Sequence, residues 1–170
     1  MADVGCGPGH TTKFLADLGV TAITGIDLSE DMILQAKRLF PTIAFETGNM
    51  LAFEKPDQFF GSMLGFYAIV HFKKQELKQF FAEAFRVLKP SGQLLISFHV
   101  GDEVRTVDEL LGVKASADFY FHEVDPVCEL LSATGFKLVD TMIRYPYKEK
   151  EFPTQRAYII AEKSLTEDRS

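Results

Sequence analysis

Three glycines near the start of the chain, each separated from the next by one residue, have the spacing of a ligand-binding turn. Gly5, Gly7 and Gly9 follow a short apolar stretch and precede a stretch with helical spacing. Glycine lacks a Cβ, so the backbone there can adopt positive φ and a ligand can approach it closely. The turn would deliver that ligand to a helix N-terminus, where unpaired N–H groups favour anionic or strongly polar groups. Alone, the pattern is weak, because a simple tight turn uses the same residues.

An acidic residue further along strengthens this prediction. Asp27 follows residues 22–26, a run typical of a buried strand, and lies about 20 residues after the glycine turn. A carboxylate at the tip of the second strand is placed to accept hydrogen bonds from a ribose diol. The turn and the carboxylate together predict a ligand that contains a nucleoside.

Strands and helices that position these residues alternate along the chain. Strands are expected at 1–4, 22–26, 43–46, 61–67, 94–98, 136–144 and 156–162, and helices at 11–18, 30–40, 74–88 and 125–133. Residues 90–92 indicate a turn, and 101–121 is the least regular part. We expect a short helix at Leu110 and Leu111 and an extended piece at 119–121. The last two strands are expected to be antiparallel, because a parallel crossover needs a longer connection.

The alternation predicts an α/β fold. It is a three-layer, open, mostly parallel sheet with helices on both faces and an antiparallel strand pair at the C-terminal end. We expect one domain over 1–163 and a polar tail at 164–170. Ligands bind such sheets beyond the carboxyl ends of the strands, where the strand order switches. The glycine turn, Asp27 and Asn49 all follow strands and should meet there.

Composition excludes several classes of protein. The chain is 46% apolar and 25% charged, as in ordinary globular proteins, and its net charge of −6 argues against a nucleic-acid partner. We expect no membrane partner, because no apolar run is long enough to span a bilayer and the start lacks a signal-peptide pattern. Cys6 and Cys128 form no disulfide framework, which favours a reducing, cytoplasmic location. We expect no metal site, and the sequence does not decide between monomer and homodimer.

Four stretches resemble class I S-adenosylmethionine-dependent methyltransferases, of the bacterial small-molecule type. Residues 3–9 (DVGCGPG) resemble the first motif of that class, and residues 25–29 (GIDLS) resemble its second strand and helix start. Residues 85–92 (FRVLKPSG) resemble the turn from helix to strand, and residues 135–158 resemble the final helix and reversed hairpin. The resemblance covers nearly the whole chain and implies the fold predicted above.

S-adenosylmethionine is the cofactor that the resemblance implies, with S-adenosylhomocysteine as product. The implied contacts are Asp3, Gly5, Cys6, Gly7, Pro8, Gly9 and His10 around the methionine part, Asp27 on the ribose, Leu28, Met32, Asn49 and Met50 around the adenine, and Phe66 with Tyr67 at the methionine amine. The implied acceptor of the methyl group is a small molecule.

Methyl transfer from a sulfonium depends mainly on in-line positioning and exclusion of water. A general base is needed only where the acceptor arrives protonated. His71 follows the fourth strand and is our first candidate for that base, with Tyr67 as the second. His99 and Arg144 are weaker candidates, because surface or structural roles explain them equally well.

Two other functions compete with this one. The first is an NAD(P)-dependent oxidoreductase, whose fingerprint G-x-G-x-x-G would place a third glycine where His10 stands. The second is a cofactor-binding remnant without catalytic activity. Relatives usually carry a further segment before the first motif, and this chain begins almost at that motif.

Overall fold

The computed structural model describes residues 1–110 and 113–164. Its elements are β1 (Ala2–Val4), α1 (His10–Asp17), β2 (Thr24–Asp27), α2 (Glu30–Leu39), β3 (Ala44–Thr47), β4 (Phe60–Phe66), the 3-10 turn η1 (Ile69–His71), α3 (Lys74–Val87), β5 (Leu88–His99), β6 (Val104–Leu110), β7 (Val113–Tyr120), α4 (Val124–Thr134), β8 (Phe136–Arg144) and β9 (Arg156–Lys163). Seven strands form one sheet in the order β3-β2-β1-β4-β5-β9-β8. Within this sheet β9 runs opposite to the others, because it pairs antiparallel with both β5 and β8.

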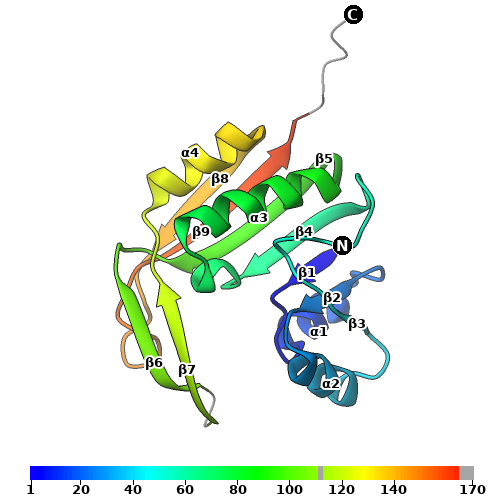
Figure 1. Cartoon of the computed structure of the whole chain (residues 1–170), viewed down its shortest axis with the longest axis horizontal. Helices are drawn as coiled ribbons and strands as arrows, with labels where there is room; N and C mark the ends of the chain where they lie inside the picture. Colours follow the sequence, from blue (N-terminus) through cyan, green and yellow to red (C-terminus); the bar gives the residue numbers. More distant parts are fainter. Residues whose placement is uncertain (111–112, 165–170) are drawn as a thin grey trace, which may run out of the picture.

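Helices cover both faces of this sheet (Figure 1). On one face, α3 and α4 bury Phe80, Phe81 and Leu131 in the larger apolar cluster. On the other face, α2 buries Ile33 against Phe45 of β3 in a smaller cluster. The parallel sheet between two helical layers and the antiparallel pair β8–β9 confirm the predicted fold class.

Helix α2 begins where its sequence predicts. Ser29 has an extended backbone, and its hydroxyl accepts a hydrogen bond from the Met32 N–H at 3.3 Å. Glu30 and Asp31 lie in the first turn and basic residues in the last, which complements the helix dipole. Because the cap immediately follows β2, it fixes the direction in which the chain leaves Asp27.

Helix α1 departs from the expected apolar face. Phe14 and Leu18 are exposed, and the buried residue of this helix is Thr12. The Thr12 hydroxyl donates a hydrogen bond of 2.6 Å to the Asp3 carboxylate. The polar contact with β1, rather than apolar spacing, therefore sets which side of α1 faces the sheet.

The irregular segment after β5 is a β-hairpin, so the expected helix at Leu110 and Leu111 is wrong. Leu110 ends β6, and Leu111 lies outside the described residues. Strands β6 and β7 pair antiparallel, and the Thr106 hydroxyl donates to the Asp118 carboxylate at 2.7 Å. β-branched residues in β6 and aromatic residues at the end of β7 favour strands and outweighed the leucine pair. The extended piece predicted at 119–121 is the end of β7 and the residue after it. Figure 1 shows the hairpin projecting away from the main sheet.

The turn predicted at residues 90–92 lies inside a strand. Strand β5 already begins at Leu88, and Ser91 has a φ of 58° within it. The register with β4 shifts between Phe60 and Ser62, so a bulge absorbs the left-handed residue while the ladder continues. The fifth strand is therefore longer at its amino end than the apolar run indicates.

Three further expectations concern the C-terminal tail, a membrane-spanning helix and a metal site. Of the tail at 164–170, Ser164 is described and the rest lies outside the described residues. No helix among residues 1–110 and 113–164 is long and apolar enough to cross a bilayer. Within the same residues, no group of three or more His, Cys, Asp or Glu side chains is placed to hold a metal ion.

Candidate functional site

The strand order switches at the boundary between β1 and β4. β1 continues into the glycine turn, and β4 ends at Phe66, so both segments emerge at the same edge of the sheet. Gly5, with a φ of 66°, is where they touch. A Cβ there would lie 2.7 Å from the Cβ of Ala68, closer than real Cβ atoms come to a neighbour. Glycine is therefore required for the turn to approach the chain after β4.

The second glycine of the turn has an open side. Gly7 has a φ of 52°, and a Cβ built on it would meet no atom within 4 Å. Packing therefore does not explain the glycine, although the left-handed backbone favours it. The backbone at Gly7 is therefore open on this side at the start of α1, which allows the close approach of an adenosyl amino acid. Gly9, in contrast, is filled: a Cβ there would lie 2.6 Å from the ring of Phe45.

Asp27 reaches the turn directly. Its Oδ2 accepts a 2.7 Å hydrogen bond from the Gly7 N–H, and its Oδ1 accepts a 2.9 Å bond from the Ser29 N–H. These two donors fix the carboxylate between the turn and the start of α2. Two carboxylate oxygens offer about four acceptor sites, so lone pairs remain for a ribose diol. The two features from which the sequence predicts a nucleoside are thus in contact.

Asp3, in the middle of β1, is almost fully buried, with 1% of its surface exposed. Burial raises the pKa of its carboxyl to about 6, the hydrogen bond from Thr12 lowers it, and the nearby charge of Asp27 raises it further. Two acidic side chains thus lie beneath the turn and make its surroundings electronegative. Such a field favours the cationic end of a ligand, here an amino group or a sulfonium.

The residues expected around an adenine lie beyond β2 and β3. Leu28 is 68% exposed, and Leu28 and Asn49 both line a cavity of about 280 Å³. The Asn49 carboxamide oxygen accepts a hydrogen bond from the Leu51 N–H at 2.9 Å, which shapes this loop. Met32 and Met50 are half-buried nearby, Met50 against Gly5. An exposed apolar side chain beside a cavity suits a planar base.

The remaining residues expected at the turn are Cys6, Pro8 and His10. Cys6 is buried, and desolvation raises the pKa of its thiol to about 12, so it is no nucleophile at neutral pH. Pro8 is half-buried. His10 is exposed, and its ring makes a T-shaped contact with that of Phe40, with 5.5 Å between the ring centroids. The turn therefore contributes backbone rather than reactive side chains.

Tyr67 carries the backbone strain of the site. Its φ is 56°, a left-handed conformation that costs an ordinary residue about 1–3 kcal/mol. The Tyr67 N–H is held by Ser97 of β5, whose hydroxyl and carbonyl oxygens accept from it at 3.0 and 3.1 Å. Ser97 is fully buried and came from an apolar run, so sequence reasoning missed it. In this conformation the Tyr67 side chain contacts His99 of β5 and Tyr158 of β9.

Aromatic side chains surround Tyr67 and form what we call the aromatic wall. Its members are Phe66, Tyr67, His99, Phe121, Phe152 and Tyr158, with ring centroids of neighbours 4.9–6.4 Å apart. The Tyr67 and Tyr158 hydroxyls lie 3.5 Å apart, and Arg144 Nε donates to Tyr158 at 3.2 Å. Phe121, Phe152 and Tyr158 come from segments far apart in sequence, so no local signal predicts that they pack together beside Tyr67.

The other candidates for catalysis are His71, His99 and Arg144, and each has different neighbours. His71 is exposed on η1, and its described contacts are with β7: Nδ1 lies 3.3 Å from the Asp118 carbonyl oxygen, and its ring lies 4.8 Å from that of Phe119. His99 joins the aromatic wall and has a lowered pKa because burial disfavours its charge. Arg144 makes two hydrogen bonds of 2.8 Å with the Glu151 carboxylate. His71 therefore lies on the hairpin side, with no described contact to the glycine turn.

Sheet order and site together define a class I S-adenosylmethionine-dependent methyltransferase domain. The reversed β9, the glycine turn after β1 and the carboxylate after β2 are the features that define it. A family model described as a methyltransferase domain matches residues 1–92, and the chain belongs to this family. S-adenosylmethionine is accordingly the cofactor, and the dinucleotide alternative is set aside.

Individual proteins show the same relationship. A probable S-adenosylmethionine-dependent methyltransferase of Mycolicibacterium smegmatis is 28% identical over 150 residues, which are 84% of this chain and 53% of that protein. Phosphoethanolamine N-methyltransferase 1 of Zea mays is 29% identical over 143 residues, which are 82% of this chain and 28% of that protein. This chain therefore spans about half or less of the length of these relatives.

Solved structures show the fold. A S-adenosylmethionine-dependent methyltransferase from Methanosarcina mazei superposes with a TM-score of 0.85 at 18% identity. The superposition covers 96% of this chain and 92% of that one, and so includes β8 and β9, beyond the residues that the family model matches.

Removing the carboxylate of Asp27 is expected to weaken cofactor binding. Asp27→Ala removes acceptors for the ribose and frees the Gly7 and Ser29 N–H groups, which together corresponds to about 1–3 kcal/mol, or roughly a 5- to 150-fold higher Kd. Calorimetric titration with S-adenosylhomocysteine measures it. Asp31→Ala, at an exposed position in the first turn of α2, is the matched control. An unchanged Kd for Asp27→Ala would show that the ribose lies elsewhere.

Proposed function

We propose that this protein transfers a methyl group from S-adenosylmethionine to a small-molecule acceptor. The observation that carries the proposal is the hydrogen bond between Gly7 and Asp27, beside a backbone surface left open on its outer side. When bound there, the cofactor supplies an electrophilic methyl group on a sulfonium. The chain's own residues then have to hold the cofactor, position the acceptor and exclude water.

Cofactor binding is assigned to three strand ends, those of β1, β2 and β3. We assign the methionine part to the turn of Gly5, Gly7 and Gly9, the ribose to Asp27 and the adenine to the cavity at Asn49. The buried carboxylate of Asp3 lies behind the turn and favours a cationic amino group through its field. Both acidic side chains act through charge and hydrogen bonds, without a covalent step.

The acceptor is assigned to the aromatic wall. Phe66 is 40% exposed at the end of β4, and Tyr67 projects from a strained backbone beside it. Aromatic faces bind flat or apolar bodies and exclude water from the reacting atoms. Arg144 and Glu151 neutralise each other at the edge of the wall. A small acceptor is consistent with the Zea mays relative, whose name specifies phosphoethanolamine.

Two side chains, His71 and Tyr67, are candidates for removing a proton from the methyl acceptor or for donating a hydrogen bond to it. A carbonyl oxygen only accepts, so the contact of His71 with Asp118 places the proton of a neutral ring on Nδ1 and leaves Nε2 as a free base. Burial, reinforced by the Tyr158 hydroxyl, raises the pKa of Tyr67 above its ordinary value. Tyr67 therefore remains protonated at neutral pH and is suited to donate a hydrogen bond. We assign the base to His71 and acceptor orientation to Tyr67.

We infer the partners and the location of this activity from the charge of the chain and from its cysteines. A net charge of −6 disfavours a phosphate-backbone acceptor, so we assign neither nucleic acid nor membrane as partner. Cys6 and Cys128 are both free thiols, one buried and one half-buried, which suits a reducing compartment such as the cytoplasm.

Transfer of a labelled methyl group tests the proposal. The purified protein is incubated with S-adenosylmethionine labelled on the methyl group and a metabolite extract, and labelled products are separated by chromatography. We expect a labelled product whose formation falls at least tenfold in His71→Ala, because the base is lost. Lys73→Ala, another exposed position near the start of α3, is the control.

The outcomes separate the alternatives. Cofactor binding without transfer to any compound would support a non-catalytic remnant. Transfer at the same rate in His71→Ala and in the wild type at every pH would remove the base from His71 and leave the proposed reaction standing. Binding of NAD in preference to S-adenosylhomocysteine would overturn the proposal.

A further inference from the structure

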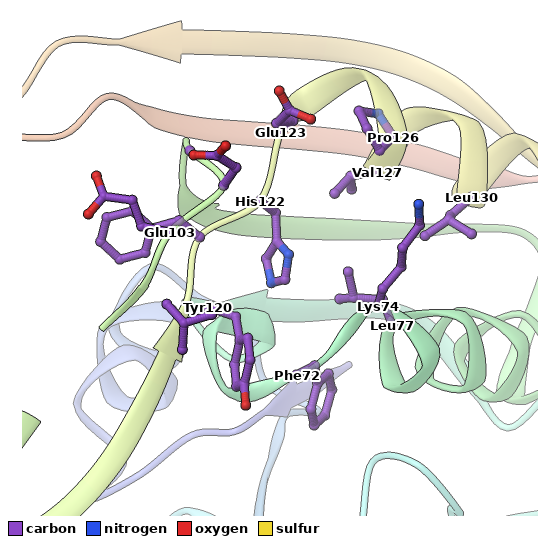
Figure 2. Close-up of a pocket in the computed structure, with 14 residues that line it drawn as sticks. Phe72, Lys74, Leu77, Glu103, Tyr120, His122, Glu123, Pro126, Val127 and Leu130 are labelled. Atoms are coloured by element: carbon purple, nitrogen blue, oxygen red, sulfur yellow. The ribbon is translucent and has the colours of Figure 1, made fainter. Parts of the chain in front are cut away.

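A second cavity lies at the base of the β6–β7 hairpin and borders the aromatic wall at Phe121. It has a volume of about 250 Å³ and is enclosed by the starts of α3 and α4, the loop after β5 and the chain that leaves β7. Pockets that bind drug-sized ligands have volumes of about 300–1,000 Å³, so this cavity suits a smaller molecule. Figure 2 shows its side chains, with His122 near the centre and Tyr120 and Phe72 along one side.

Successive residues after β7 serve the two sites. Phe121 stacks on His99 of the aromatic wall at 5.3 Å and is also part of the cavity boundary. Tyr120 and His122, its neighbours in sequence, line the cavity. Phe121 is therefore shared, whereas Tyr120 and His122 are not members of the aromatic wall. The cavity adjoins the proposed methyl-transfer site, but its polar lining groups differ from those of that site.

His122 is the polar group at the centre of this cavity. It is 9% exposed, and its Nε2 lies 3.1 Å from the Ile69 carbonyl oxygen. The carbonyl only accepts, so the proton of the neutral ring is on Nε2 and Nδ1 is a bare acceptor. Burial lowers the pKa of His122, which keeps the ring neutral. Among the described residues His122 Nδ1 has no hydrogen-bond partner, and it is not sealed from solvent, so the donor of a bound ligand can reach it.

The rim of the cavity has acidic side chains. Asp102, Glu103 and Glu123 line it, with Lys74 on the side of α3 (Figure 2). Glu103 is paired with Arg105 at 3.0 Å, whereas Asp102 and Glu123 have no ion pair within the described part of the chain. The walls are apolar, formed by Phe72, Leu77, Val127 and Leu130. The lining thus combines a hydrogen-bond acceptor, unpaired carboxylates and an apolar interior.

We propose that this cavity is a second binding site, for a small organic amine with an apolar body. The protonated amine donates to His122 Nδ1 and lies near the carboxylates of Asp102 and Glu123. Its apolar part fills the space between Phe72 and Leu130. This inference is independent of the proposed methyl transfer, because the groups assigned to bind the amine, His122, Asp102 and Glu123, belong neither to the glycine turn nor to the aromatic wall.

Benzylamine is the probe that tests it. Titration is followed by amide chemical shifts in the full chain with S-adenosylhomocysteine present, and benzyl alcohol and benzoate are titrated in parallel. We expect saturable shifts at residues 101–104 and 122–127 with benzylamine, at least fivefold weaker binding of benzyl alcohol, and no binding of benzoate. Shifts confined to residues 5–9 or 66–67, or equal binding of amine and alcohol, would overturn the proposal, as would the absence of saturable binding.

Variants assign the recognition to named groups. In His122→Gln the side-chain amide can still donate to the Ile69 carbonyl, but the Nδ1 acceptor is gone, so we expect at least fivefold weaker benzylamine binding in a folded protein. Glu123→Gln should weaken binding, and Lys74→Gln should strengthen it, because a like charge is removed. Glu129→Gln and Lys78→Gln, on the exposed surfaces of the same two helices, should change nothing. Unchanged binding in both His122→Gln and Glu123→Gln would contradict the proposed recognition.

Discussion

Gly9→Ala is expected to destabilise the fold by about 2–5 kcal/mol, whereas Gly7→Ala is expected to keep the fold and lose cofactor binding. A methyl group on Gly9 would lie 2.6 Å from the Phe45 ring and 3.2 Å from the Cβ of Ala36, in a backbone with a φ of 84°. Overpacking costs about 1–3 kcal/mol, and the left-handed conformation costs about 1–2 kcal/mol more. Phe45 is itself buried, so it has little room to move aside.

The same methyl group on Gly7 meets open space. The folded state then bears only the conformational cost of about 1–2 kcal/mol, within the 5–15 kcal/mol stability of a typical domain. The methyl group would, however, occupy the side that faces the cofactor. We expect roughly a 10- to 100-fold higher Kd for S-adenosylhomocysteine, which corresponds to about 1.4–2.8 kcal/mol.

Urea unfolding and calorimetric titration of both variants measure the two effects separately. Gly61→Ala is the control, because Gly61 also has open space around it but no positive φ. Wild-type affinity in Gly7→Ala would show that the open side of the turn is not where the cofactor binds. Wild-type stability in Gly9→Ala would show that Phe45 yields.

Asp3→Asn is expected to stabilise the protein at neutral pH, by up to about 3 kcal/mol. The pKa of Asp3 is about 6 in the folded protein, against an ordinary value of 3.8. Between these values the folded state holds a proton that the unfolded state has released, so wild-type stability falls as pH rises from about 4 to 6 and stays lower above it. The difference corresponds to about 3 kcal/mol at 1.36 kcal/mol per tenfold change. Asparagine carries no charge, and its amide oxygen still accepts from Thr12.

Thermal or urea unfolding from pH 4 to pH 8 tests this prediction. The gain of Asp3→Asn should be small at pH 4 and largest above pH 6, and S-adenosylhomocysteine should bind more weakly, because the negative field behind the turn is reduced. Asp17→Asn, an exposed position on α1, should change stability by at most about 0.5 kcal/mol. A gain independent of pH would contradict the account of Asp3 as a charge held in the core at a cost. Destabilising charge retained at a binding site is a common trade of stability for function.

The proposed cofactor site could be predicted from the sequence, because the signals that indicate it are local. A glycine turn depends on backbone freedom within a few residues, and Ser29 caps α2 with an N–H three residues away. Alternating strand and helix patterns were enough to predict the parallel sheet, and the short connection between the last two strands was enough to predict that they are antiparallel. Asp27 could be assigned because the end of a second strand has a set place in such a sheet.

The acceptor side and the second cavity were decided by tertiary structure. Tyr158, Phe121 and Phe152 meet Tyr67 only because β9, the hairpin and the loop before β9 fold back to the ends of β4 and β5. Hydrogen bonds of Tyr67 to Ser97 likewise cross between neighbouring strands.

Local sequence therefore determined the fold class and the contact of the glycine turn with Asp27, to which we assign the cofactor, since both follow from backbone conformation and periodicity. It misjudged the hairpin, where a pair of leucines indicated a helix that strand pairing overrode. It also could not distinguish the roles of the histidines, which depend on partners distant in sequence: Asp118 for His71, Thr154 for His99 and Ile69 for His122. A hydrogen bond or a pKa is set by whatever the fold brings within reach, and only the assembled structure supplies those neighbours.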